Sequence, residues 1–82
     1  MNGPLSTQAE FYQKLGYAFQ KQKRLDEALE AYQKADTIKP DNIWTNRHLA
    51  ICYRLARNFS KALEYHRKAE ELLPRTIASY ST

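Results

Sequence analysis

The sequence contains only one cysteine, two glycines and three prolines, and it has no apolar run long enough to cross a bilayer. The single cysteine, Cys52, excludes an internal disulfide and leaves no Cys/His cluster for a metal ion. Residues 1–5 lack the charged and apolar regions of a secretion signal. We therefore expect either a soluble cytoplasmic protein without a membrane segment or a piece of a longer chain.

Motifs of catalysis are also missing, because the sequence has no glycine-rich phosphate loop, no Ser/His/Asp arrangement and no paired carboxylates. The separation of His48 and His66 does not suggest a metal site. Cys52 is interpreted as a small buried apolar residue rather than a nucleophile. We expect no enzyme activity, no cofactor, no metal ion and no small-molecule substrate.

The net charge of +4 is modest, but it is unevenly distributed along the chain. Residues 9–22 and 43–56 together carry four basic side chains and one acidic one, a balance of +3. Residues 26–38 and 60–73 carry four basic and seven acidic ones, a balance of −3. This segregation matters more than the total charge. Because acidic residues are interspersed and no motif that reads DNA or RNA is present, we expect no nucleic-acid binding.

Part of the sequence returns after thirty-four residues. Seven pairs at this spacing are identical: Leu15/Leu49, Ala28/Ala62, Leu29/Leu63, Glu30/Glu64, Lys34/Lys68, Ala35/Ala69 and Pro40/Pro74. A fixed period of this length indicates a repeat array. In each unit, apolar residues recur at helical spacing on both sides of a short break, so each unit is predicted to form a pair of helices.

The apolar periodicity predicts four helices, over about residues 8–21, 25–38, 43–56 and 59–72. The break at Lys23–Arg24 is so short that the first two helices have to lie antiparallel as a hairpin. We therefore predict one two-repeat domain over residues 8–76, with its repeats at 9–42 and 43–76.

The two ends of the chain are predicted to lie outside this domain. Thr7 and Glu10 have the spacing of a capping box at the start of the first helix, so residues 1–7 are expected to be a disordered lead-in. Residues 77–82 are too few for a complete further helix. They are expected to form a C-terminal tail or part of a capping helix.

On this frame the chain resembles the tetratricopeptide repeat, with two copies covering about residues 9–76. The first unit matches the family pattern at Tyr12, Leu15, Gly16, Phe19, Ala28, Tyr32, Ala35 and Pro40. The second unit matches it at Leu49, Ala50, Tyr53, Ala62, Ala69 and Pro74, with Asn46 and His66 as departures. The resemblance implies an all-α fold, an α-α superhelix of two antiparallel helix hairpins.

The turns depart from the family pattern, which usually has glycine where this chain has Lys23 and Arg57. Because a residue other than glycine at positive φ costs about 1 kcal/mol, we expect a slightly altered turn, with Asn58 in the left-handed conformation in the second unit. Between the hairpins, Asp41 or Asn42 is placed to cap the third helix.

Members of this family are protein-interaction modules in which the first helix of each hairpin lines a concave groove. The resemblance therefore implies binding of a protein or peptide, as part of a larger scaffold or regulatory protein. Carried over position by position, the groove consists of Gln13, Tyr17, Gln20, Lys21, Trp44, Arg47, Ile51, Arg54 and Leu55.

The third helix is predicted to carry a second apolar stripe of Trp44, Ile51 and Leu55, rotated away from its core stripe. Arg47 and Arg54 belong to the same outer stripe, which favours an acidic peptide with apolar anchors as ligand. The competing interpretation is that Trp44 and Leu55 pack against neighbouring helices or the C-terminal tail.

Self-association is the alternative function, because an array of two hairpins leaves the outer face of its last helix uncovered. Another copy, the tail or further repeats are the candidate covers for Leu63, Leu72, Leu73 and Ile77. His66 stands where the family has an aromatic residue and is predicted to be a partly buried, hydrogen-bonded core histidine. His48 is predicted to face solvent.

Overall fold

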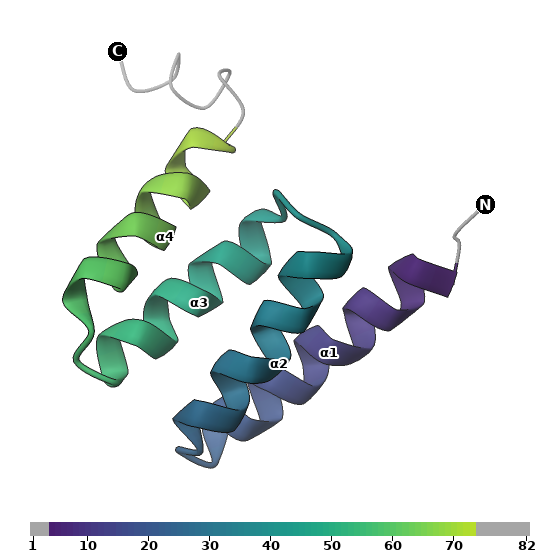
Figure 1. Ribbon diagram of the computed structural model, residues 1–82, viewed down its shortest axis with the longest axis horizontal. Helices are drawn as coiled ribbons and strands as arrows, with labels where there is room; N and C mark the ends of the chain where they lie inside the picture. Colours follow the sequence, from purple (N-terminus) through teal and green to yellow (C-terminus); the bar gives the residue numbers. More distant parts are fainter. Residues whose placement is uncertain (1–3, 74–82) are drawn as a thin grey trace.

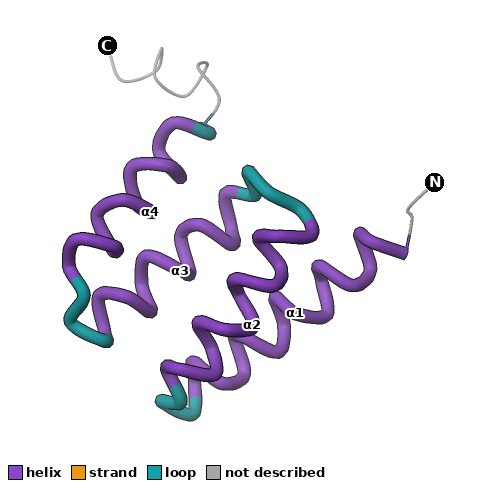
Figure 2. The backbone as a smooth tube through the Cα atoms, in the orientation of Figure 1, coloured by secondary structure: helices purple, strands orange, loops and turns teal. Residues whose placement is uncertain are grey.

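The computed structural model of the protein describes residues 4–73, and all regular structure in that range is helical. The helices are α1 (Pro4–Lys21), α2 (Leu25–Ile38), α3 (Ile43–Leu55) and α4 (Phe59–Glu71). In Figure 1, α1 lies beside α2 and α4 beside α3, while α2 and α3 make the main contact between the pairs. Short loops join successive helices (Figure 2). The predicted all-α fold of two antiparallel hairpins is confirmed.

Three of the four helices begin and end within one residue of the predicted positions, but the first does not. Helix α1 begins at Pro4, so residues 4–7 are helical and the predicted disordered lead-in and capping box at Thr7 are wrong there. Proline suits the first position of a helix because its missing N–H has no intrahelical partner in any case. Residues 1–3 of the lead-in and the tail predicted at residues 77–82 lie outside the described residues.

The turn within each hairpin keeps the left-handed residue that glycine usually provides. Lys23 and Arg57 have φ of 66° and 67°. The backbone N–H that follows each of them reaches back to a helix carbonyl, from Arg24 to Phe19 over 2.9 Å in the first hairpin. This is the closure of a Schellman motif, which requires the left-handed conformation.

The corresponding bond in the second hairpin runs from the Asn58 N–H to the Tyr53 carbonyl over 2.8 Å. The prediction that Asn58 takes the left-handed role is wrong, because it has a φ of −94° and its side chain caps α4 by accepting the Lys61 N–H. Between the hairpins, Asn42 is the residue that caps α3, its Oδ1 accepting the Thr45 N–H over 3.1 Å.

The core lies where the two hairpins meet. It contains the buried side chains Ala28, Tyr32, Leu49, Cys52, Tyr53 and Ala62. Gly16 is required by close approach, since a Cβ atom there would lie 2.8 Å from two carbons of the Tyr32 ring. Burial of Cys52 is confirmed and raises the pKa of its thiol to about 11, so the side chain is a neutral, packed group at neutral pH.

Candidate functional site

Trp44 lies in the first turn of α3, where this helix meets α1 and α2. Its ring stacks on His48 with centroids 3.8 Å apart and planes inclined by 22°. The ring centroids of Tyr32 and Tyr17 lie 5.9 Å and 6.4 Å from that of Trp44. We call these four residues the aromatic cluster. The cluster is partly exposed to solvent: Tyr17 is 44% and Trp44 40% exposed, whereas Tyr32 is fully buried.

The competing interpretation of Trp44, packing against neighbouring helices, therefore applies in part, and its role in a binding surface stays a prediction. The ring packs against neighbouring helices, and it still presents apolar surface to solvent. Leu55, at the other end of α3, is 48% exposed and belongs neither to the core nor to the aromatic cluster.

His48 does not face solvent as predicted but is half-buried beneath Trp44. Its Nδ1 lies 3.0 Å from the Trp44 carbonyl oxygen, and because that oxygen only accepts hydrogen bonds, Nδ1 carries the proton. Burial lowers the pKa of His48, the hydrogen bond to Trp44 opposes this, and the nearby Arg47 lowers it further. The sequence could have indicated this stacking, because Trp44 and His48 are four residues apart and side chains at that spacing lie next to each other on a helix.

The stability of the protein is expected to fall on acidification through His48. Because its pKa is lower in the folded than in the unfolded state, the unfolded state binds more protons as the pH falls below about 6.5. The stabilisation is complete above that pH and is lost as the pH falls through the folded-state pKa. Urea unfolding between neutral and mildly acidic pH should show a smaller loss in His48→Gln than in the wild type. Identical pH dependence in the two proteins would contradict this assignment.

Two of the predicted groove residues are used within the fold. The Gln13 side chain donates from Nε2 to Thr45 Oγ1 over 2.8 Å and so joins α1 to α3. The Tyr32 hydroxyl donates to Gln20 Oε1 over 2.8 Å and joins α2 to α1. Both glutamines therefore join helices within the fold instead of being fully free to contact a ligand, and Gln20 does so through Tyr32 of the aromatic cluster.

Lys21 and Tyr17 lie together on α1, with the Lys21 ammonium nitrogen 5.5 Å from the Tyr17 ring centroid. This is within the range of a cation–π contact. A positive charge therefore borders the aromatic cluster on the α1 side.

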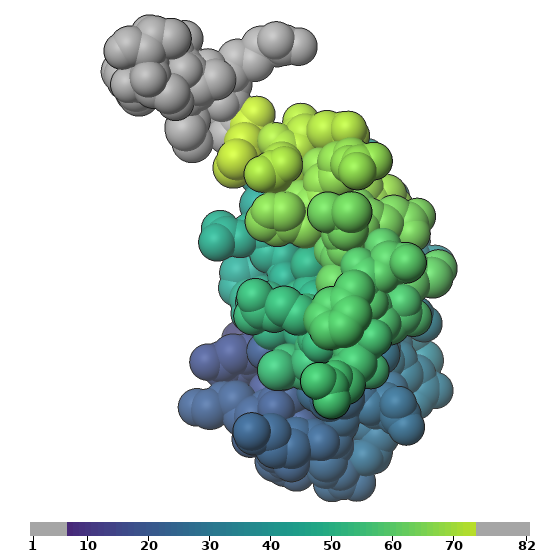
Figure 3. Space-filling model, turned by 90° about the vertical axis from the view of Figure 1, so that its left-hand side faces the viewer, coloured from purple at the N-terminus to yellow at the C-terminus, as the bar shows by residue number. Residues whose placement is uncertain are grey.

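The remaining predicted residues, Arg47, Ile51 and Arg54, line an adjoining surface, which we call the α3–α4 hollow; Arg47 is near enough to His48 of the aromatic cluster to lower its pKa. Its volume is about 480 Å³, and it is lined by Arg47, Ala50, Ile51, Arg54, Phe59, Ala62, Leu63 and His66. Sequence reasoning missed the contribution of α4. The sequence predicted an uncovered outer face on this last helix that includes Leu63, but it placed the groove on α1 and α3 alone. Phe59 and Leu63 are 60% and 56% exposed. Figure 3 shows the outer side of α4, in green to yellow, open on this face of the molecule.

The prediction for His66 is wrong, because this residue is not part of the core. Its side chain is 62% exposed, and its Nε2 lies 3.5 Å from Glu70 Oε2. The equivalent residue of the first unit, Tyr32, is buried because Trp44 and His48 of α3 lie against it. Within residues 4–73 no helix lies against His66 in that way.

A family model described as tetratricopeptide repeat matches residues 7–75, which is most of the chain. The chain belongs to the tetratricopeptide repeat family. The hairpins α1–α2 and α3–α4 are its two repeats. A search of curated proteins found no match.

Membership of the tetratricopeptide repeat family makes this protein a protein–protein interaction module in the general sense. Repeats of this family are typically non-catalytic. Within residues 4–73 no three His, Cys, Asp or Glu side chains are grouped so that they could hold a metal ion. In the same range, no helix has the length and hydropathy that crossing a membrane requires.

Proposed function

We propose that this tetratricopeptide repeat protein binds an acidic segment of another protein, carrying apolar anchor side chains, in a groove along α1 and α3. The observation that carries this proposal is the half-open aromatic cluster bordered by basic side chains. Aromatic and arginine side chains are the usual energetic centres of protein interfaces, which is why this surface is favoured over the others.

The anchors of the segment would meet the exposed apolar parts of the groove. Tyr17 and Trp44 are 44% and 40% exposed, and Leu55, at the far end of α3, is 48% exposed. Trp44 is already held in place by His48 and Tyr32, so little side-chain freedom would be lost on binding.

The charges of the two helices favour an acidic ligand. Helices α1 and α3 carry Lys14, Lys21, Arg47 and Arg54 against a single acidic residue, Glu10. Within residues 4–73, neither arginine takes part in an ion pair. By contrast, α2 carries four acidic side chains and one basic one. An acidic segment is therefore attracted to the α1–α3 side and repelled by α2.

The charge reversal Arg47→Glu with Arg54→Glu tests the proposal. The probe is a synthetic peptide of Glu and Asp with Leu or Phe at every third or fourth position. Two attractions of roughly 0.5 kcal/mol each become repulsions of about the same size, a total change of about 2 kcal/mol, so affinity should fall about 30-fold. Trp44 is the only tryptophan, and its fluorescence reports binding directly.

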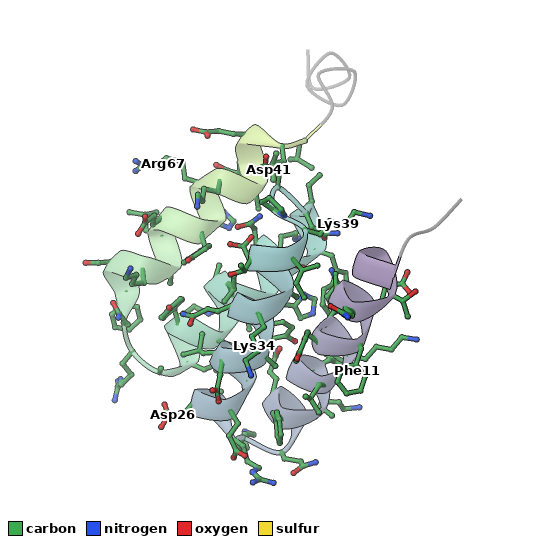
Figure 4. The ribbon with its side chains drawn as sticks, turned by 45° about the vertical axis from the view of Figure 1, so that its right-hand side comes forward. Phe11, Asp26, Lys34, Lys39, Asp41 and Arg67 are labelled. Carbon is green, nitrogen blue, oxygen red and sulfur yellow. The ribbon has the colours of Figure 1, made fainter. Side chains whose placement is uncertain are left out.

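The matched control is Lys61→Glu with Arg67→Glu, which makes the same charge change on α4; Figure 4 shows Arg67 pointing away from the molecule. This variant should retain most of the affinity, and circular dichroism should show unchanged helicity in both. Equal affinity of the wild type and the Arg47/Arg54 variant would overturn the proposal, as would equal binding of a peptide with lysine in place of the acids.

A further inference from the structure

The α3–α4 hollow has a counterpart in the first hairpin that is already filled. Thirty-four residues earlier, its lining corresponds to Gln13, Gly16, Tyr17, Gln20, Leu25, Ala28, Leu29 and Tyr32. Helix α3 is seated on that surface. Thr45 accepts a hydrogen bond from Gln13, and Trp44 and His48 lie against Tyr17 and Tyr32. The fold itself therefore shows that the corresponding surface of the first hairpin receives a helix.

At the opposite end of the molecule, α1 exposes the residues that correspond to the buried contact face of α3. The residues that α3 buries between the hairpins, Thr45, Leu49 and Cys52, are all 0% exposed. Their counterparts thirty-four residues earlier on α1 are Phe11, Leu15 and Ala18. Phe11 is 59% exposed, Ala18 is exposed and Leu15 is half-buried. Figure 4 shows Phe11 projecting from α1 away from α2.

We propose that copies of this chain associate head to tail, with α1 of one copy seated in the α3–α4 hollow of the next, as α3 is seated on α1 and α2 within the chain. Each end then covers the apolar surface that the other leaves exposed. On this register Phe11 takes the place of Thr45 beside Arg47. It is larger than threonine, and the hollow of about 480 Å³ has room for its ring.

The hollow is basic, and Glu10 is the one acidic side chain that α1 would bring to it, together with Lys14 and Lys21. Glu10 is the only acidic residue of α1, and its counterpart in the second repeat is Trp44. Trp44 lies against Tyr17 and Tyr32. Glu10 would therefore face their counterparts in the next copy, Ile51 and His66. The hollow contains Arg47, Arg54 and His66 and no acidic lining residue. Lys14 corresponds to His48 and lies one helical turn after Glu10. These two oppositely charged side chains of α1 would therefore lie side by side in the hollow of the next copy.

An interface of this kind is heterologous, because each copy uses a different surface at each end. A dimer formed in this way still has one unoccupied α1 face and one unoccupied hollow, so further copies can add to it. The wild-type mass measured by sedimentation equilibrium is therefore expected to rise with concentration beyond that of a dimer. The hollow shares Arg47 and Arg54 with the proposed α1–α3 groove, whereas Phe11 belongs to neither surface. Phe11→Asp should therefore abolish association and leave binding of the acidic peptide unchanged, so the two proposals can fail independently.

Two single substitutions test the arrangement, each at an exposed site where folding should be retained. Phe11→Asp blocks the α1 end and leaves the hollow intact, whereas Leu63→Asp blocks the hollow and leaves α1 intact. Each variant alone should be a monomer of 9.6 kDa. An equimolar mixture should sediment at twice that mass, because one intact end remains on each. Thr37→Asp, at an exposed site of α2, should associate as the wild type does.

Circular dichroism establishes that all variants are folded before sedimentation is interpreted. The proposal is overturned if the wild type stays monomeric at every concentration, which would mean that another molecule or segment covers the hollow. It is equally overturned if the mixture of folded variants remains monomeric, or if the wild type stops at a dimer, since that indicates a twofold interface.

Discussion

Tyr32→Ala is expected to lower the free energy of unfolding by about 3–5 kcal/mol, the range seen when a large buried aromatic side chain is removed. Tyr32 is 0% exposed and lies against Gly16, Trp44 and His48. A domain of this size has a total stability of roughly 4–12 kcal/mol, so one substitution removes a large share of it. Urea unfolding followed by circular dichroism measures the loss.

The repeat supplies a matched control for this substitution. His66→Ala changes the same position of the second unit, but the His66 side chain is 62% exposed, so the change should stay within about 0.5 kcal/mol. Similar losses in the two variants would mean that Tyr32 and His66 are equally buried in solution and would contradict the structure.

Tyr32→Phe separates packing from hydrogen bonding. Burial raises the pKa of the Tyr32 hydroxyl, which therefore stays protonated and donates to Gln20. Loss of that bond alone should cost roughly 0.5–1.5 kcal/mol. The greater part of the Tyr32→Ala effect is thus assigned to the ring.

Leu49→Ala is expected to be the second most damaging substitution, with a loss of about 2–5 kcal/mol. Leu49 is 0% exposed in the cluster where the two hairpins meet, so its removal leaves a cavity between them. The identical residue of the first unit, Leu15, is only half-buried, and Leu15→Ala should cost less. Equal losses at the two sites would show that the α1 face is as well covered as the interface between the hairpins.

Much of the fold was predictable because helix boundaries are encoded locally. The start of α3 follows from Pro40 and the capping residue Asn42. The start of α1 was predicted wrongly because Thr7 has capping chemistry, yet Pro4 provides an equally suitable first residue three positions earlier. The turn at Arg57 was also predicted wrongly, since the Schellman hydrogen bond outweighs the small cost of a left-handed arginine.

The candidate site was only partly predictable. The sequence pattern placed Trp44, Arg47 and Arg54 on the outer side of α3, and these residues are exposed there. It did not show that the arginines lie over α4 while Trp44 lies over α1 and α2, because helical periodicity says nothing about which neighbour each side meets. The stacking of His48 on Trp44 was missed for the same reason.

The sequence by itself determined the four helices, their pairing and the buried strip of α3, because apolar periodicity and a thirty-four-residue spacing depend only on the order of the residues. Only the tertiary structure decided that Tyr32 and His66, at the same position of two repeats, are buried and exposed respectively. The physical reason is that burial depends on what packs against a side chain. Helix α3 lies over the first hairpin, and within residues 4–73 no helix lies over the second.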